Sequence, residues 1–181
     1  MYMHPLLVAM AACRILYISD WGTKPGIFSL KTDGSDFTSL VNTSISWPNG
    51  LALDFPGKRL YWVDAKYKIV ETINLDGTGR VVVKQLPEGA HPWSIDVFEE
   101  MMVWSDSEGF RVSFSNRFSG EDIMSISISQ PNLSGIKVVQ EALQLGKSSH
   151  SSRFLQRYIM MPILYCEDSS SVRGSMNSLP V

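Results

Sequence analysis

The chain has 181 residues, of which 44% are hydrophobic and 19% are charged, a composition typical of a globular protein. Its formal net charge of −2, with no basic stripe, argues against nucleic-acid binding. The longest apolar runs, residues 6–13 and 158–166, are shorter than the ~18 residues that a membrane-spanning helix needs, so we expect no membrane insertion by this segment.

The N-terminal segment can be interpreted in two ways. Residues 6–12 could be the apolar part of a signal peptide, because small residues follow them. No Lys or Arg precedes the run, however, and the segment fits the repeat described next. We therefore predict a strand here rather than a signal peptide.

Three markers recur with a period of about 43 residues. An aromatic–Asp motif closes an apolar run at residues 15–21, 59–65 and 102–107, and its aspartates are 44 and 42 residues apart. A proline precedes an alternating apolar stretch at Pro5, Pro48 and Pro92. A turn ends in glycines spaced 43 residues apart, namely Gly34, Gly77 and Gly120. A fixed period of this length indicates a repeat architecture.

Each repeat is predicted to contain four strands. Residues 50–54 and 93–97 alternate between apolar and polar side chains, which is the pattern of a half-buried strand. In the middle repeat, residues 60–63 form the second strand, and residues 69–75 and 80–84 flank an Asp-Gly turn. Asp-Gly between two such runs is a strong hairpin signal. Four short strands in about 43 residues are typical of a β-propeller blade.

The repeat starts a fourth time and then stops. Residues 135–139 supply a first strand, but no aromatic–Asp motif or Asp-Gly turn follows. We therefore predict two regions, a partial propeller at 1–140 and a poorly ordered tail at 141–181 that lies outside the repeat.

The two cysteines, Cys13 and Cys166, are far apart and form no spaced pair. This excludes a zinc cluster or a disulfide-rich module within the chain. The sequence leaves open whether both thiols are free or bridge each other.

The repeats resemble the class B, or Tyr-Trp-Thr-Asp, repeats of the LDL-receptor family over roughly residues 4–139. Further stretches typical of that family are residues 20–22, 33–35, 47–54, 91–99 and 115–120. The resemblance implies a six-bladed β-propeller in a secreted or cell-surface protein, normally flanked by cysteine-rich EGF-like modules. Six such blades need about 260 residues. We therefore predict an all-β fold, a partial six-bladed β-propeller with about three four-stranded blades plus the start of a fourth.

The repeat motif itself is expected to have a structural role. Its members are Tyr17, Asp20, Tyr61, Trp62, Asp64, Trp104 and Asp106. The aspartates lie one per blade and are therefore separated rather than clustered, so we expect them to accept backbone hydrogen bonds from neighbouring strands. The aromatic residues are expected to pack between sheets.

His91 is the best single candidate for a functional residue. Histidine titrates in the pH range of endosomes, and His91-Pro92 resembles a family loop in which a histidine takes part in the acid response. The resemblance also implies a second histidine in this acid response. Its position corresponds here to Lys68, which cannot act as the same switch. The structural alternative is that His91 is simply a turn residue before a proline. His4 occupies the equivalent turn of the preceding blade.

Three other residues could form a protein-binding surface with His91, namely Trp47, Trp93 and Lys66. The two tryptophans could equally fill gaps between blades. Asn42 and Asn132 begin sequences that match the N-glycosylation pattern, and Asn42 is the more plausible acceptor because it lies in a predicted loop.

The resemblance implies a non-enzymatic fragment of an endocytic receptor ectodomain, extracellular, with lipoprotein- or vitellogenin-type cargo and pH-dependent release. Its partners would be protein ligands or cysteine-rich repeats of the same receptor, and calcium is expected only in neighbouring modules, with no cofactor in this chain. The chain shows no nucleophile elbow, P-loop or metal-ligand pattern that would indicate an enzyme. Three alternatives stay open: a Wnt co-receptor-type propeller, a nidogen-like matrix-binding propeller, and a truncated chain without a function of its own.

Overall fold

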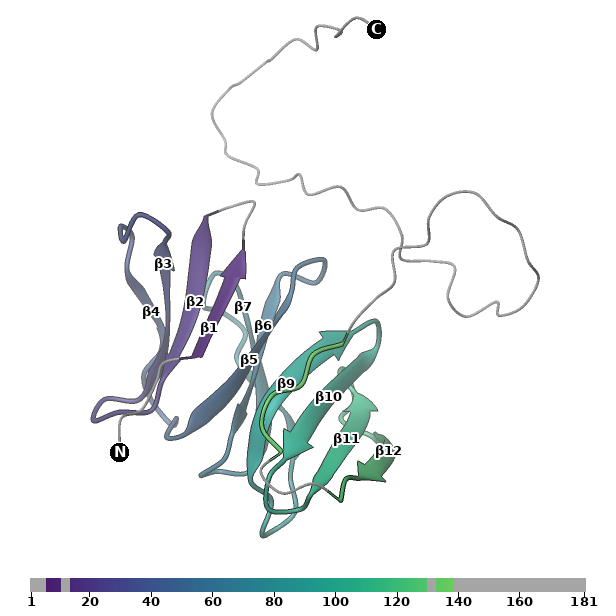
Figure 1. Cartoon of the computed structure of the whole chain (residues 1–181). Helices are drawn as coiled ribbons and strands as arrows, with labels where there is room; N and C mark the ends of the chain where they lie inside the picture. Colours follow the sequence, from purple (N-terminus) through teal and green to yellow (C-terminus); the bar gives the residue numbers. More distant parts are fainter. Residues whose placement is uncertain (1–5, 11–13, 130–132, 139–181) are drawn as a thin grey trace, which may run out of the picture. The chain divides into compact units, whose positions relative to one another are not determined.

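The computed structural model describes residues 6–10, 14–129 and 133–138, and for residues 6–10 it describes the backbone only (Figure 1). Twelve strands make up the regular structure of these residues. Their bounds are β1 Leu6–Met10, β2 Ile15–Asp20, β3 Gly26–Lys31, β4 Thr38–Val41, β5 Pro48–Asp54, β6 Arg59–Asp64, β7 Ile69–Asn74, β8 Val81–Gln85, β9 Pro92–Phe98, β10 Met101–Asp106, β11 Arg111–Asn116 and β12 Asp122–Ser127. The described residues contain no helix that is long and apolar enough to cross a membrane.

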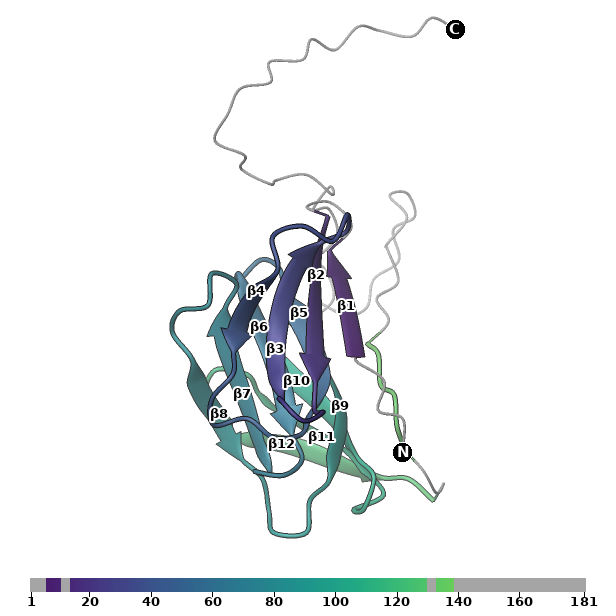
Figure 2. The ribbon, with the colours of Figure 1, turned by 90° about the vertical axis from the view of Figure 1, so that its left-hand side faces the viewer.

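The strands form three antiparallel sheets in the order β1-β2-β3-β4, β5-β6-β7-β8 and β9-β10-β11-β12. Each sheet is one repeat, with strands that pair in chain order. The first strands lie next to one another, since β1 contacts β5 and β5 contacts β9. Figure 2 shows the outer strands β4 and β8 on the side opposite β1 and β9. The predicted all-β fold with three four-stranded propeller blades is therefore confirmed, as is the strand at the N-terminus.

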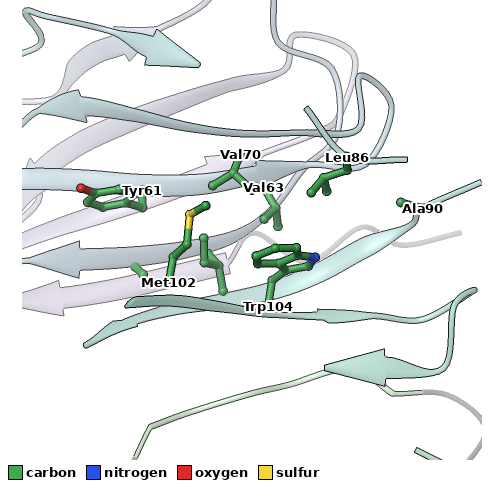
Figure 3. Packing of buried hydrophobic residues seen from close by; sticks show 9 residues of the cluster. Tyr61, Val63, Val70, Leu86, Ala90, Met102 and Trp104 are labelled. Carbon is green, nitrogen blue, oxygen red and sulfur yellow. The ribbon is translucent and has the colours of Figure 1, made fainter. Parts of the chain in front are cut away.

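Alternating side chains on the central strands fill the spaces between blades. Between the first two blades, Tyr17 and Ile27 pack against Leu60, Trp62 and other buried residues. Between the second and third blades, the buried cluster consists of Ala52, Tyr61, Val63, Val70, Leu86, Ala90, Ile95, Met102 and Trp104. Figure 3 shows Met102 and Trp104 pointing toward Tyr61, Val63 and Val70. Because a strand presents successive side chains to opposite faces, β6 contributes to both clusters.

The predicted turns have the backbone that glycine permits. Gly34, Gly77 and Gly120 have φ values of 84°, 84° and 74°, which lie in the left-handed region. In the middle blade, hydrogen bonds from the Thr78 hydroxyl and backbone N–H hold the pKa of Asp76 below its usual value. The repeated turn therefore combines a glycine with a side chain that accepts local hydrogen bonds.

The start of the fourth repeat differs from the prediction, because residues 133–138 form no strand. They nevertheless lie beside β9. The backbone N–H groups of Ile136 and Val138 donate to Ser94 Oγ at 3.2 Å and to Asp96 Oδ2 at 2.8 Å. These partners are 42 residues apart in sequence, close to the repeat period. The segment thus lies at the position of the next first strand, and in the described residues no strand of a fourth blade pairs with it.

The predicted tail at 141–181, together with Cys13, Cys166, His4 and Asn132, lies outside the described residues. The predicted region boundary at residue 140 lies there too, so it stays a prediction.

Candidate functional site

Asp64 organises the end of the second blade where β5 begins and β6 ends. Its carboxylate is completely buried. Oδ2 accepts the backbone N–H groups of Ser46 and Trp47 at 2.8 and 3.2 Å, and Oδ1 accepts those of Lys66 and Tyr67 at 2.9 and 3.0 Å. One side chain therefore holds the loop before β5 against the turn after β6. The donors lie in loops of the same blade and not, as predicted, in neighbouring strands.

Asp106 has the same position in the third blade. Its Oδ1 accepts the N–H groups of His91 at 3.0 Å and Gly109 at 2.9 Å, and Arg111 lies 3.6 Å from Oδ2. Asp20, in the first blade, accepts the N–H of Gly22 at 2.9 Å. Repetition of the motif thus places Trp47 and His91 at equivalent positions of two adjacent blades, each just before the proline that begins a first strand.

The structure brings the four residues of the predicted binding surface together. The Trp47 and His91 ring centroids are 6.2 Å apart, and those of His91 and Trp93 are 6.3 Å apart with the planes inclined by 22°. The ammonium of Lys66 lies 5.3 Å from the centroid of Trp47. We call this set Lys66, Trp47, His91 and Trp93 the aromatic row. It extends across the second and third blades.

The aromatic row is accessible at its indole rings. Trp47 and Trp93 are each 38% exposed, and His91 is half-buried between them. Part of each indole can therefore be reached by a partner, and the binding role of the row stays a prediction. Half-exposed tryptophans next to a cation are frequent in protein-binding surfaces, because they combine a large apolar area with few rotatable bonds.

Two exposed aromatic residues at the same end of the blades were missed by sequence reasoning. Tyr67 and Phe110 are 48% and 47% exposed, and they lie in the turns that follow β6 and β10. Both residues lie outside the three recurring markers, and the signal that could have found them is their short distance after the motif aspartates.

The remaining motif aromatics are part of the core. Tyr17, Tyr61, Trp62 and Trp104 are all buried between sheets. No group of three or more metal-ligating side chains occurs among residues that the structure describes.

The loop that contains Asn42 is exposed but firmly held. Arg80 donates to the carbonyl oxygens of Thr43 and Ser44, each at 2.7 Å, and its guanidinium also pairs with the buried carboxylate of Glu71. Asn42 itself is exposed. The site is therefore sterically open to glycosylation, which stays a prediction.

Comparison of the sequence with known proteins shows which family of repeats the three blades resemble. Residues 14–55 match the model of the low-density lipoprotein receptor repeat class B. The chain is 41% identical over 108 residues to a vitellogenin receptor of Solenopsis invicta and 42% identical over 110 residues to the vitellogenin receptor Yl of Drosophila melanogaster. The chain carries LDL-receptor class B repeats.

These class B repeats are a small part of the vitellogenin receptors. The alignments include 59% and 60% of this chain but only 6% and 5% of the two receptors. A human low-density lipoprotein receptor-related protein 5-like protein is 31% identical over 142 residues, which are 77% of this chain and 54% of that protein. The sequence relatives are thus named as receptors or receptor-related proteins.

Solved structures show the same fold at lower identity. A chain of a nidogen/laminin complex superposes with a TM-score of 0.66 at 23% identity, over 71% of this chain and 49% of that one. Regucalcin, a calcium-binding protein of Agrobacterium tumefaciens, gives a TM-score of 0.59 at 18% identity, over 70% of this chain and 46% of that one. The class B blades therefore superpose on somewhat less than half of each of these chains.

Proposed function

We propose that the aromatic row is a protein-binding surface of an extracellular receptor propeller that takes up lipoprotein- or vitellogenin-type cargo and responds to endosomal pH. The observation that carries the proposal is the position of His91 between two half-exposed indoles, with the Lys66 ammonium over the ring of Trp47. The similarity to two vitellogenin receptors supports this class of cargo.

The mechanism rests on charge. At neutral pH Lys66 is the cation of the row, whereas an imidazolium at His91 would add a second one beside the same indole. Two cations near exposed aromatic rings favour a partner with carboxylates and apolar side chains. An acidic cysteine-rich repeat of the same receptor fits that description, and its binding at low pH would displace cargo.

The proposal is a binding function and not catalysis. Its support is the receptor names of the relatives and the separation of Asp20, Asp64 and Asp106, which lie one per blade and accept backbone N–H groups. Such aspartates are occupied by structural hydrogen bonds.

The test is binding of the chain to an acidic cysteine-rich repeat at about pH 7.4 and about pH 5.5, measured by surface plasmon resonance. We expect tighter binding at the lower pH. Trp93→Ala should weaken binding at least about 5-fold at both pH values, and His91→Ala should remove the difference between them. Phe118→Ala is the control, because Phe118 is 66% exposed but lies in the turn after β11, at the opposite end of the blade. Unchanged pH dependence in His91→Ala would contradict the mechanism.

A second function is favoured by the 31% identity to the low-density lipoprotein receptor-related protein 5-like protein. In that case the aromatic row would bind a secreted signalling protein directly, as a Wnt co-receptor does. Binding would then depend on Trp47 and Trp93 but not on His91 protonation, so the same variants separate the two functions. A nidogen-like matrix function has fold similarity alone in its support.

A further inference from the structure

Ser107, in the third blade, makes a polar contact with the imidazole of His91. It follows the motif Asp106 at the end of β10. Its backbone N–H donates to the carbonyl oxygen of His91 at 3.1 Å. Its hydroxyl oxygen lies 3.1 Å from Nδ1 of the ring and 3.2 Å from the same carbonyl oxygen.

The second blade provides an internal comparison. Ala65 is at the position of Ser107, and its N–H donates to the carbonyl oxygen of Trp47 at 3.0 Å. The backbone link between the two loops is therefore the same in both blades and needs no hydroxyl. What Ser107 adds is a side-chain contact to the ring, in the one of these two blades where the ring is a histidine.

The number of available hydrogens decides whether the Ser107 hydroxyl donates to Nδ1 of His91 or accepts from it. A serine hydroxyl has one hydrogen to donate and can also accept. If it donated to Nδ1, its contact with the carbonyl oxygen would have no hydrogen. If Nδ1–H donates to Oγ and Oγ–H donates to the carbonyl oxygen, both contacts are hydrogen bonds. We infer that Ser107 is a positioning residue that holds neutral His91 in the Nδ1–H form.

The other ring nitrogen, Nε2, is then the one without a hydrogen and the one to which a second proton would add. Among the described residues, the buried side-chain polar atoms without a partner are Ser19 Oγ, Trp62 Nε1 and Arg117 Nε. Within residues 14–129 and 133–138, no hydrogen bond to Nε2 of His91 occurs, and Nε2 is not one of these fully buried atoms. The imidazolium also carries a hydrogen on Nδ1, which means that protonation at Nε2 leaves the bond to Ser107 intact.

This arrangement sharpens the chemistry of recognition, and it rests on the proposed function of the aromatic row. At neutral pH His91 presents an accepting lone pair at Nε2, which repels a carboxylate. At acid pH it presents a charged N–H donor in the same place. In the other neutral form Nε2–H would be a donor at both pH values, so only the charge would change. Ser107 therefore increases discrimination against acidic partners at neutral pH.

The charged groups near His91 do not determine which ring nitrogen carries the hydrogen. The ammonium of Lys66 lies over the ring of Trp47. The carboxylate of Asp106 accepts the backbone N–H of His91 and pairs with Arg111. Neither group has a hydrogen bond to the ring.

The direct test is long-range ¹H–¹⁵N NMR of the full chain with labelled histidine at neutral pH, with His91→Ala used to assign the His91 signals. We expect Nδ1 to be the protonated nitrogen in the wild-type chain. Ser107→Ala should shift the ratio of the two neutral forms toward Nε2–H by about 2- to 10-fold, the equivalent of one hydrogen bond. Ser107→Thr keeps the hydroxyl and should keep the wild-type ratio. Ser107→Val has the shape of the threonine variant without its hydroxyl and should behave like the alanine variant.

Two results would overturn the inference: a wild-type ring protonated at Nε2, or equal ratios in the threonine and valine variants. Ala65 shows that a blade accepts alanine at this position, so loss of the fold is not expected in Ser107→Ala. Failure of the proposed function has a different signature, since the NMR result would stand while the acidic repeat failed to bind.

Discussion

Asp64 shows how one buried carboxylate can determine the conformation of a loop. Its two oxygens accept four backbone N–H groups, two from the loop before β5 and two from the turn after β6. A buried charge is tolerated only with such partners. The side chain that the repeat motif identifies as structural therefore also sets the position of Trp47 and Lys66, which are half of the aromatic row.

Removing this carboxylate should destabilise the fold strongly. Asp64→Ala leaves four N–H groups without their acceptor, and we expect a loss of about 3 kcal/mol or more in the free energy of unfolding, measured by urea denaturation. Asp64→Asn should lie between this variant and the wild type, because the amide offers one oxygen in place of two. Glu88→Ala is the control and should change stability by less than about 1 kcal/mol, since the Glu88 side chain is 91% exposed in its pair with Lys68. A loss below about 1 kcal/mol in Asp64→Ala would show that the loops hold without the carboxylate.

At the scale of the strand, the close approach of β5 and β9 depends on a residue without a side chain. A Cβ added at Gly50 would lie 2.7 Å from the backbone nitrogen of Ile95 and 2.8 Å from the Cα of Ser94. Both neighbours are backbone atoms, which cannot rotate away. The two first strands are also joined by Asn49 Nδ2, which donates to the carbonyl oxygen of Pro92 at 2.9 Å.

Gly50→Ala should therefore force the second and third blades apart. We expect a loss of about 1–3 kcal/mol in the free energy of unfolding, the usual cost of overpacking. Gly135→Ala is the matched control, because no atom lies within 4 Å of its added Cβ. Equal melting temperatures for the two variants would rule out this steric account.

At the scale of the whole propeller segment, Arg117 joins two blades. It lies just after β11, and its guanidinium pairs with the buried carboxylate of Asp54 in the second blade. The same group lies 6.0 Å from the ring centroid of Tyr61 and 4.5 Å from that of Phe118. The ion pair joins residues that are 63 positions apart in the sequence.

Removing only the Arg117 side of this ion pair should lower the free energy of unfolding more than removing both charges. Arg117→Met leaves Asp54 buried without its cation, and we expect a loss of about 3–5 kcal/mol by thermal and urea denaturation. The double variant Arg117→Met with Asp54→Asn should recover part of that loss, because no charge is then left unpaired. Simple additivity of the two single changes would mean that the pair does not couple the blades.

Much of the fold follows from the sequence, because the features that define a blade are local. Period-2 alternation, the proline that begins a first strand and the Asp-Gly turn each act within a few residues, and the strands at Pro48–Asp54 and Arg59–Asp64 lie close to where these signals predict them. Residues 133–138 depart from the pattern because a strand needs a neighbour with which to pair. An alternating sequence cannot supply that neighbour.

The sequence by itself determined the repeat, the blade and the candidates for a binding surface. Only the tertiary structure decided that Lys66, Trp47, His91 and Trp93 form one row, that Ser107 contacts the imidazole, and that Arg117 reaches Asp54. The physical reason is that local propensities and turns fix each blade. Contacts between residues from different blades depend instead on how the sheets pack, which no short stretch of sequence encodes.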